Sequence, residues 1–160
     1  MKELLESLPR IRLEDAHSFV LLDTCFLINL LEHHKHLEKL NSYSVGITSF
    51  NAEEVIHIEH RLSHEDKITL RRFFRSHPKL FIVEVPVHPG DREGERKFVG
   101  SVDSELLKNV SDASDAVLMA AAIKTGSTVL TKDKHHLFTV VLESFLQKYG
   151  IKVYKDLNSF

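Results

Sequence analysis

The chain has 160 residues and a mass of 18.4 kDa, the size of one domain with one sizeable core. Its apolar fraction of 42% and charged fraction of 28% are ordinary for a soluble globular protein, and its net charge of −2 gives no whole-chain attraction to nucleic acid. The single cysteine excludes an intramolecular disulfide and favours a reducing, cytoplasmic compartment. The N-terminus lacks a signal-peptide core, and no apolar run approaches the roughly 20 residues that cross a bilayer, so we expect no membrane association.

The first third of the chain predicts a leader followed by two strand–helix units. Residues 1–17 are polar and helical in character, with one proline interrupting them. The apolar run at 19–24 predicts a buried strand, and residues 25–40 carry leucines at helical spacing. A second strand at 45–50 leads into a helix at 51–61.

The middle of the chain predicts a basic helix, a third strand and an insertion. Residues 64–76 form a helix that ends before a His-Pro pair. The apolar strand at 80–86 is closed by a proline. Residues 88–94 predict a loop, and the mixed-charge segment 95–110 predicts a helix.

The last third predicts two further helices and two strands. The Ala-rich segment 114–125 is a helix that ends at a glycine. A strand at 127–133, a helix at 135–149 and a strand at 151–154 follow. This alternation predicts an α/β fold, a three-layer α/β/α sandwich with a mostly parallel central sheet.

Four acidic residues stand where a parallel α/β sheet places an active site. Asp23 and Asp133 close apolar strands, and Glu54 and Asp115 lie near the starts of helices. The carboxyl ends of parallel strands and the amino ends of the following helices share one edge of a sheet. Four carboxylates there repel one another unless a cation neutralises them, so the set predicts a divalent metal site.

Each acid also has a purely structural interpretation. Asp23 could cap the following helix, and Asp115 could favour the first turn of its own helix. Glu54 could complete a capping box that starts at Asn51, and Asp133 could be a turn residue. Capping does not require the four positions to converge, whereas a metal site does, so the set as a whole favours metal binding.

The four acids lie in four motifs, which in chain order are V-L-L-D-T-C-F-L-I-N-L-L, I-T-S-F-N-A-E-E-V, S-D-A-V-L-M-A-A-A-I-K-T-G and T-V-L-T-K-D-K-H-H-L. These motifs resemble those of the PIN domain, a nuclease family that includes the VapC-like toxin ribonucleases of toxin–antitoxin modules. The resemblance covers residues 19–154, and the last two motifs are the most specific. Glu53 remains an alternative to Glu54, and Asp112 could share or replace the role of Asp115.

The resemblance implies hydrolysis of RNA phosphodiester bonds with Mg²⁺ or Mn²⁺, ions that hard oxygen ligands suit. Asp23, Asp115 and Asp133 would bind one or two ions directly or through water. Glu54 would bind metal or orient the attacking water. The ion would lower the pKa of that water and neutralise charge at the phosphorus.

The resemblance also implies a domain organisation and partners. We expect residues 1–160 to form one PIN-like domain, with a helical leader at 1–18 and a loop-plus-helix insert at 86–111 that a minimal member lacks. The substrate would be single-stranded RNA, and a toxin would have an antitoxin partner and form a homodimer. Thr24 and Thr131 could orient the site acids or be ordinary strand residues.

Basic residues provide candidate RNA contacts. Lys132 and Lys134 flank the last of the four acids. Lys67, Arg71 and Arg75 recur every four residues and would form one stripe on a helix. Such a stripe is either a phosphate contact or an ordinary solvated face.

Other chemistry fits the sequence less well. His57 and His60 share a helix face but lack the H-E-x-x-H order of a zinc protease. Cys25 lies in an apolar run, which favours a buried structural thiol. The chain has no dinucleotide-binding G-x-G-x-x-G and no P-loop. The alternative to a nuclease is a non-catalytic PIN-like module that binds RNA or protein.

Overall fold

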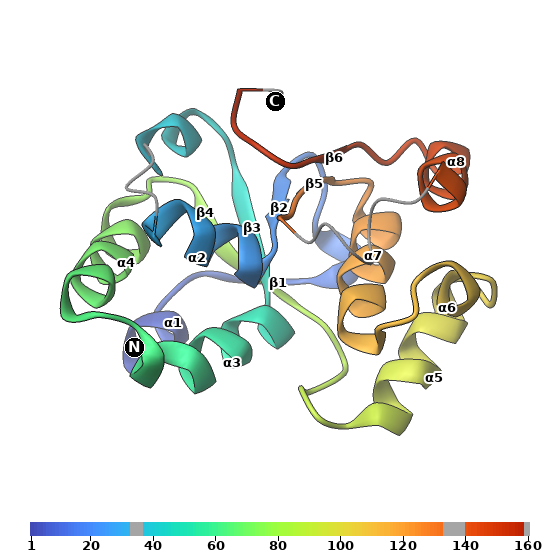
Figure 1. The fold of residues 1–160 in the computed structure, drawn as a ribbon, viewed down its shortest axis with the longest axis horizontal. Coiled ribbons are helices and arrows are strands. Elements are labelled where there is room, and N and C mark those ends of the chain that lie inside the picture. The colour runs from blue at the N-terminus through green and yellow to red at the C-terminus, as the bar shows by residue number, and fades with distance from the viewer. Residues whose placement is uncertain (33–36, 133–139, 159–160) are drawn as a thin grey trace.

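The computed structural model describes residues 1–32, 37–132 and 140–158. Its strands form one sheet in the order β1-β4-β3-β2-β5-β6, and every neighbouring pair is parallel (Figure 1). The strands are β1 (Arg10–Arg12), β2 (Val20–Leu22), β3 (Val45–Thr48), β4 (Leu80–Glu84), β5 (Thr128–Leu130) and β6 (Val153–Tyr154). The predicted α/β fold with a mostly parallel sheet is confirmed.

Helices cover both faces of this sheet. Those in the described ranges are α1 (Lys2–Glu6), α2 (Thr24–Glu32), α3 (Ser49–Ile58), α4 (His64–Ser76), α5 (Arg92–Val102), α6 (Leu106–Asn109), α7 (Ala113–Thr125) and α8 (Val140–Lys148). Short 3₁₀ turns cover Leu13–Asp15, Leu37–Ser42 and Glu59–Arg61. Helices α1 to α4 lie on one side and α5 to α8 on the other, each group over its own apolar core (Figure 1). The predicted three layers are therefore present.

The N-terminal leader differs from the helix that the sequence predicts. Lys2–Glu6 is α-helical, but Arg10–Arg12 forms β1 at the edge of the sheet, parallel to β4, and Leu13–Asp15 is a 3₁₀ turn. The backbone N–H of Ile82 donates to the carbonyl of Pro9 at 2.8 Å, which begins this pairing. A three-residue strand with two arginines carries almost no apolar signal, so local sequence could not reveal it.

The insert also differs from its prediction. The helix expected at 95–110 is two helices, α5 and α6, and α5 begins earlier because the Asp91 side chain caps the Gly94 N–H at 3.0 Å. Asp103 then takes an extended conformation and ends α5. Capping and chain direction, rather than apolar periodicity, set these boundaries.

The central position of β2 decides where a site can form. From β2 the chain runs to β3 and β4 on one side, and β5 later pairs on the other side. The order of strands therefore reverses between β2 and β5, the point at which open α/β sheets bind ligands. No helix within the described ranges is long and apolar enough to span a membrane.

Candidate active site

Asp23 lies at the carboxyl end of β2, at this reversal point. Its side chain is buried, and Thr131, just beyond β5, donates from Oγ1 to Asp23 Oδ2 at 2.8 Å. Burial, together with the nearby charge of Glu54, raises the pKa of Asp23 to about 6, although the hydrogen bond from Thr131 lowers it. The ionised form of Asp23 is thus held by neutral donors.

Glu54 comes from α3, on the neighbouring strand–helix unit. Its Oε2 accepts a hydrogen bond from Thr24 Oγ1 at 3.0 Å and another from Asn51 Nδ2 at 2.9 Å. Burial is the main cause that raises the pKa of Glu54, while these two donors lower it. In the described part of the chain, no lysine or arginine forms an ion pair with Asp23 or Glu54.

Asn51 is a site residue whose role sequence reasoning missed. The structure places the helix cap at Thr48, whose Oγ1 accepts from the Asn51 N–H at 3.0 Å. Thr48 Oγ1 also donates to Asn51 Oδ1 at 2.7 Å, so the amide nitrogen of Asn51 is turned toward Thr24 and Glu54. Asn51 therefore orients Glu54 rather than capping α3, so the capping box predicted from Asn51 is wrong.

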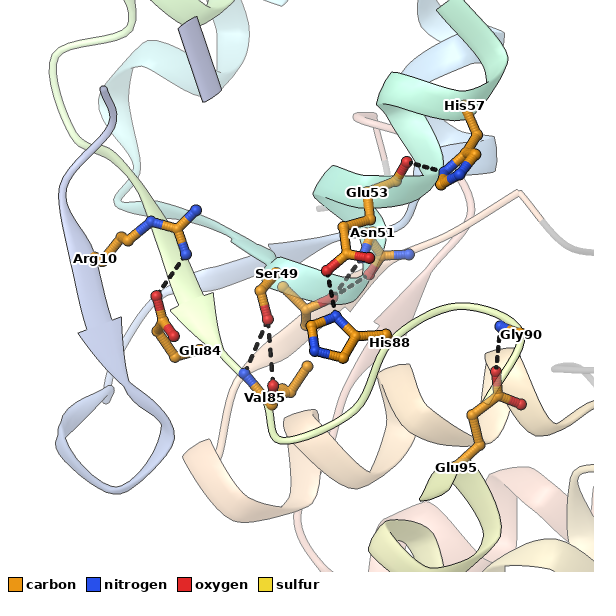
Figure 2. A network of polar contacts seen from close by, with 11 residues as sticks. Arg10, Ser49, Asn51, Glu53, His57, Glu84, Val85, His88, Gly90 and Glu95 are labelled. Atoms are coloured by element: carbon orange, nitrogen blue, oxygen red, sulfur yellow. Dashed lines mark hydrogen bonds and ion pairs between the residues drawn. The ribbon is translucent and has the colours of Figure 1, made fainter. Parts of the chain in front are cut away.

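Glu53 points elsewhere. Its Oε1 lies 2.6 Å from Nδ1 of His88, in the loop after β4 (Figure 2). The same loop is held to α3 by Ser49, whose Oγ accepts from the Val85 N–H at 3.0 Å (Figure 2). Of the two adjacent glutamates, only Glu54 is directed toward Asp23.

The amino end of α7 supplies the next acids. Asp112 is the N-cap, and its Oδ1 accepts from the N–H groups of Ser114 at 2.8 Å and Asp115 at 3.2 Å. Asp115 is half-buried in the first turn. The charge of Asp112 raises the pKa of Glu54, so this helix end faces the same site.

Glu95 is an acid that sequence reasoning did not single out. It lies on α5, is 3% exposed, and its charge also raises the pKa of Glu54. Its Oε1 accepts from the Gly90 N–H at 3.2 Å (Figure 2). Glu95, Phe98 and Val99 are all buried at helical spacing. That periodicity could have indicated a carboxylate on the inward face of the insert.

Two predicted site residues, Asp133 and Lys134, lie outside the described residues. No group of three His, Cys, Asp or Glu side chains within the described residues could hold a metal ion. Asp23 and Glu54 nevertheless fit a hard cation, because they supply ionisable oxygens without a lysine or arginine partner in that part of the chain.

A cavity of about 710 Å³ adjoins the pair. Glu54, Thr24, Cys25 and Lys132 are among its lining residues. Cys25 is exposed, so the predicted buried thiol is wrong: the residue lies on the outer face of α2, where the apolar run contributes other side chains to the core.

The predicted basic stripe belongs to α4 and does not line this cavity. Within it, Arg71 is paired with Glu59 at 2.6 Å. His57 does line the cavity, and its Nδ1 bonds to the Glu53 carbonyl at 2.7 Å. His60 Nδ1 bonds to the His57 carbonyl at 2.8 Å.

Comparison with known proteins gives a family match. The family model described as PIN domain matches residues 20–140. The curated proteins contain no match. The crystal structure of VapBC2 from Rickettsia felis bound to a DNA fragment from their promoter has a TM-score of 0.55 and 15% identity, covering 84% of this chain and 96% of that chain. At that identity the likeness shows the fold alone.

Two further solved structures are similar more distantly. PAE2754 from Pyrobaculum aerophilum has a TM-score of 0.49 and 20% identity over 82% of this chain and 89% of that chain. FitAcB from Neisseria gonorrhoeae has a TM-score of 0.48 and 17% identity over 85% of this chain and 96% of that chain.

Proposed function

Because this chain belongs to the PIN domain family, whose members are generally nucleases, we propose that it is a metal-dependent ribonuclease that hydrolyses RNA phosphodiester bonds. One observation carries the proposal. Two carboxylates, the buried Asp23 and the half-buried Glu54, come from separate strand–helix units and meet at the reversal point of the sheet with raised pKa values. Two neighbouring carboxylates repel each other when both are ionised and do not stabilise the fold. A divalent cation bound between them would remove that repulsion, so the pair suits such an ion.

The proposed ligands are Asp23, Glu54, Asp115 and Asp133, with Asp112 able to share the role of Asp115. They would hold Mg²⁺ or Mn²⁺, which supplies an activated water and neutralises charge on the phosphate. The protein's own part is orientation. Thr131 directs Asp23, while Thr24 and Asn51 direct Glu54.

The proposed substrate is single-stranded RNA, and Lys132 is the basic side chain best placed to meet it, because it lines the cavity beside Glu54. Lys134 is proposed with it from its position in the sequence. The stripe of Lys67, Arg71 and Arg75 is a weaker candidate, since α4 does not line that cavity.

We propose a toxin role, with an antitoxin partner and a homodimeric state, as one setting for the same nuclease. It rests on the motif resemblance to VapC-like toxins and on the fold shared with the VapBC2 structure from Rickettsia felis. We propose that the protein acts in the cytoplasm.

The test combines metal binding with RNA cleavage. Mn²⁺ affinity is measured by titration calorimetry, and cleavage by gel analysis of an end-labelled single-stranded RNA. We expect Glu54→Gln to lower Mn²⁺ affinity at least about tenfold and cleavage by about 10²-fold or more, because removing one charged ligand weakens both. Glu53→Gln is the matched control on the adjacent position and should leave both nearly unchanged.

A crystal soaked in Mn²⁺ provides an independent view through its anomalous scattering. A peak beside Asp23 and Glu54 is the expected result. Wild-type protein that binds no Mn²⁺ and cuts no RNA would overturn the nuclease and favour a non-catalytic binding module.

A further inference from the structure

A second cleft adjoins the acid site, between the amino ends of α5 and α7. Its volume is about 370 Å³, and Arg92, Glu95, Arg96 and Asp112 are among its lining residues. Gly90 lines this cleft and also the 710 Å³ cavity beside Glu54. The two hollows therefore meet at Gly90, in the loop that follows β4.

Two arginines on α5 give this cleft uncompensated positive charge. Arg92 and Arg96 are one helical turn apart, so both side chains lie on the same face of α5. Both are exposed, and neither side chain makes an ion pair or hydrogen bond with another described residue. Arg71 on α4, in contrast, is already paired with Glu59.

The two acids in the same cleft are each engaged by backbone donors. Asp112 Oδ1 accepts from the N–H groups of Ser114 and Asp115 at the start of α7, where the helix dipole also favours its charge. Glu95 is almost completely buried and accepts from the Gly90 N–H. Backbone N–H groups stabilise the charges of the two acids, whereas no described residue pairs with the two arginines. The mouth of the cleft therefore favours an anion.

We propose that Arg92 and Arg96 bind a backbone phosphate of the RNA strand, one that neighbours the phosphate to be cut. The inference rests on the proposed ribonuclease function and adds a substrate-binding site to it. Arginine suits this role because its planar fork donates two parallel hydrogen bonds to phosphate oxygens. The described lining has no aromatic side chain on which a base could stack, so the strand's backbone and not its bases occupies the cleft.

The loop between the two hollows is positioned for this contact by both layers of the fold. Glu53 on α3 holds His88, and Glu95 on α5 holds Gly90 (Figure 2). The loop is thereby fixed between the cavity of the acid pair and the cleft of the arginines. A strand that crosses Gly90 would meet the acids on one side and the guanidinium groups on the other.

The test is the salt dependence of RNA binding without cleavage. The probe is a fluorescein-labelled single-stranded RNA of roughly 20 nucleotides, longer than typical single-strand site sizes. Its dissociation constant is measured by anisotropy in EDTA over a range of KCl concentrations. For Arg92→Ala/Arg96→Ala we expect affinity to fall about tenfold. The slope of log affinity against log salt should shrink by about 0.7, the value for one neutralised phosphate of a single strand, because both arginines bind the same phosphate.

Matched variants separate this contact from general loss of charge. Arg61→Ala/Arg72→Ala removes two exposed arginines that line neither hollow, one from the 3₁₀ turn Glu59–Arg61 and one from α4, and should leave affinity and slope nearly unchanged. Arg92→Lys/Arg96→Lys keeps the charges and should retain most of the slope while losing part of the affinity. Thermal melting confirms that each variant is folded.

The outcomes distinguish the two proposals. Wild-type protein that binds and cuts RNA, with Arg92→Ala/Arg96→Ala unchanged in affinity and slope, would overturn the arginine site and leave the nuclease standing. An equal loss in Arg61→Ala/Arg72→Ala would also overturn it, because the effect would then be one of non-specific charge. Wild-type protein that neither binds nor cuts RNA would overturn the ribonuclease, and the arginine site with it.

Discussion

At the scale of single residues, the acid pair is held without a neutralising partner among the described residues. Asp23 is buried under the end of β2 and receives its side-chain hydrogen bond from a hydroxyl, Thr131. Burial outweighs that bond and raises the pKa of the carboxyl to about 6. The metal-free protein therefore bears an electrostatic cost at this position when Asp23 is ionised.

This cost predicts how stability changes with pH in the metal-free protein. The folded pKa of Asp23, about 6, exceeds its unfolded value of 3.8, so the folded state binds the proton more tightly. The contribution of the protonated Asp23 carboxyl to the free energy of unfolding is therefore fully present below pH 4. It is lost as the pH rises through 6, which lowers the free energy of unfolding by about 3 kcal/mol at most. Urea unfolding in EDTA at several pH values should show Asp23→Asn gaining stability relative to wild type over that range. If the free energies of unfolding of wild type and Asp23→Asn stayed parallel from pH 4 to pH 7, the result would contradict a buried, costly charge at Asp23.

The hydrogen bond from Thr131 gives a second prediction at this scale. Thr131→Val keeps the side-chain shape but leaves Asp23 without its buried hydroxyl donor. We expect unfolding free energy to fall by about 1–3 kcal/mol and Mn²⁺ affinity to fall with it, as seen by urea unfolding and calorimetry. Thr128→Val on β5 is the control, since its hydroxyl makes no hydrogen bond with a described residue. Equal effects of the two substitutions would show that the bond is unimportant.

At the scale of elements, the long apolar strands and helices were predictable, and the short polar ones were not. The run around β2 and the Ala-rich helix α7 carry strong apolar patterns, so sequence located Asp23 and Asp115 correctly on their elements. β1 is a strand of three residues at the edge of the sheet, and its partner β4 lies 72 residues later in the chain, since Arg10 pairs with Ile82. Glu95 escaped notice for a related reason, because its burial depends on how α5 packs against α7.

Glycine positions test the packing of these elements. A Cβ at Gly46 in β3 would lie 2.5 Å from Phe19 Cε2 and 3.2 Å from Val83 Cγ2, with φ in the ordinary range. Gly46→Ala should therefore lower unfolding free energy by about 1–3 kcal/mol through overpacking. Gly100 in α5 has no atom within 4 Å of such a Cβ, so Gly100→Ala should raise stability by about 0.5–1 kcal/mol. Thermal or urea unfolding measures both, and two changes of the same sign would refute the packing argument.

At the scale of the whole molecule, the site lies where the two helical layers meet. Glu54 comes from the layer of α1 to α4, and Asp112 and Glu95 come from the layer of α5 to α8 (Figure 1). The sheet lies between two separate apolar cores, and each core fixes the acids of its own side. Sequence could predict that acids gather at one sheet edge, but which layer each faces depends on packing at long range.

The short N-terminal helix joins one of these cores and gives the last prediction. Leu5 on α1 is 2% exposed and packs in the same cluster as residues of α2, α3 and α4. Leu5→Ala should lower unfolding free energy by about 2–5 kcal/mol, because a buried leucine leaves a cavity when it is shortened. Ile68→Ala on α4 is the control, since that side chain is 44% exposed and should change stability by less than about 1 kcal/mol.

Mn²⁺ affinity separates a structural role of Leu5 from a role in the site. Leu5 makes no hydrogen bond or ion pair with the acid cluster, so folded Leu5→Ala protein should bind Mn²⁺ with the affinity of wild type. If Leu5→Ala left the free energy of unfolding in urea unchanged, the first helix would lie outside the cooperatively folding unit. The buried Leu5 and the pairing of β1 with β4 predict the opposite, that the helix unfolds together with the rest of the fold.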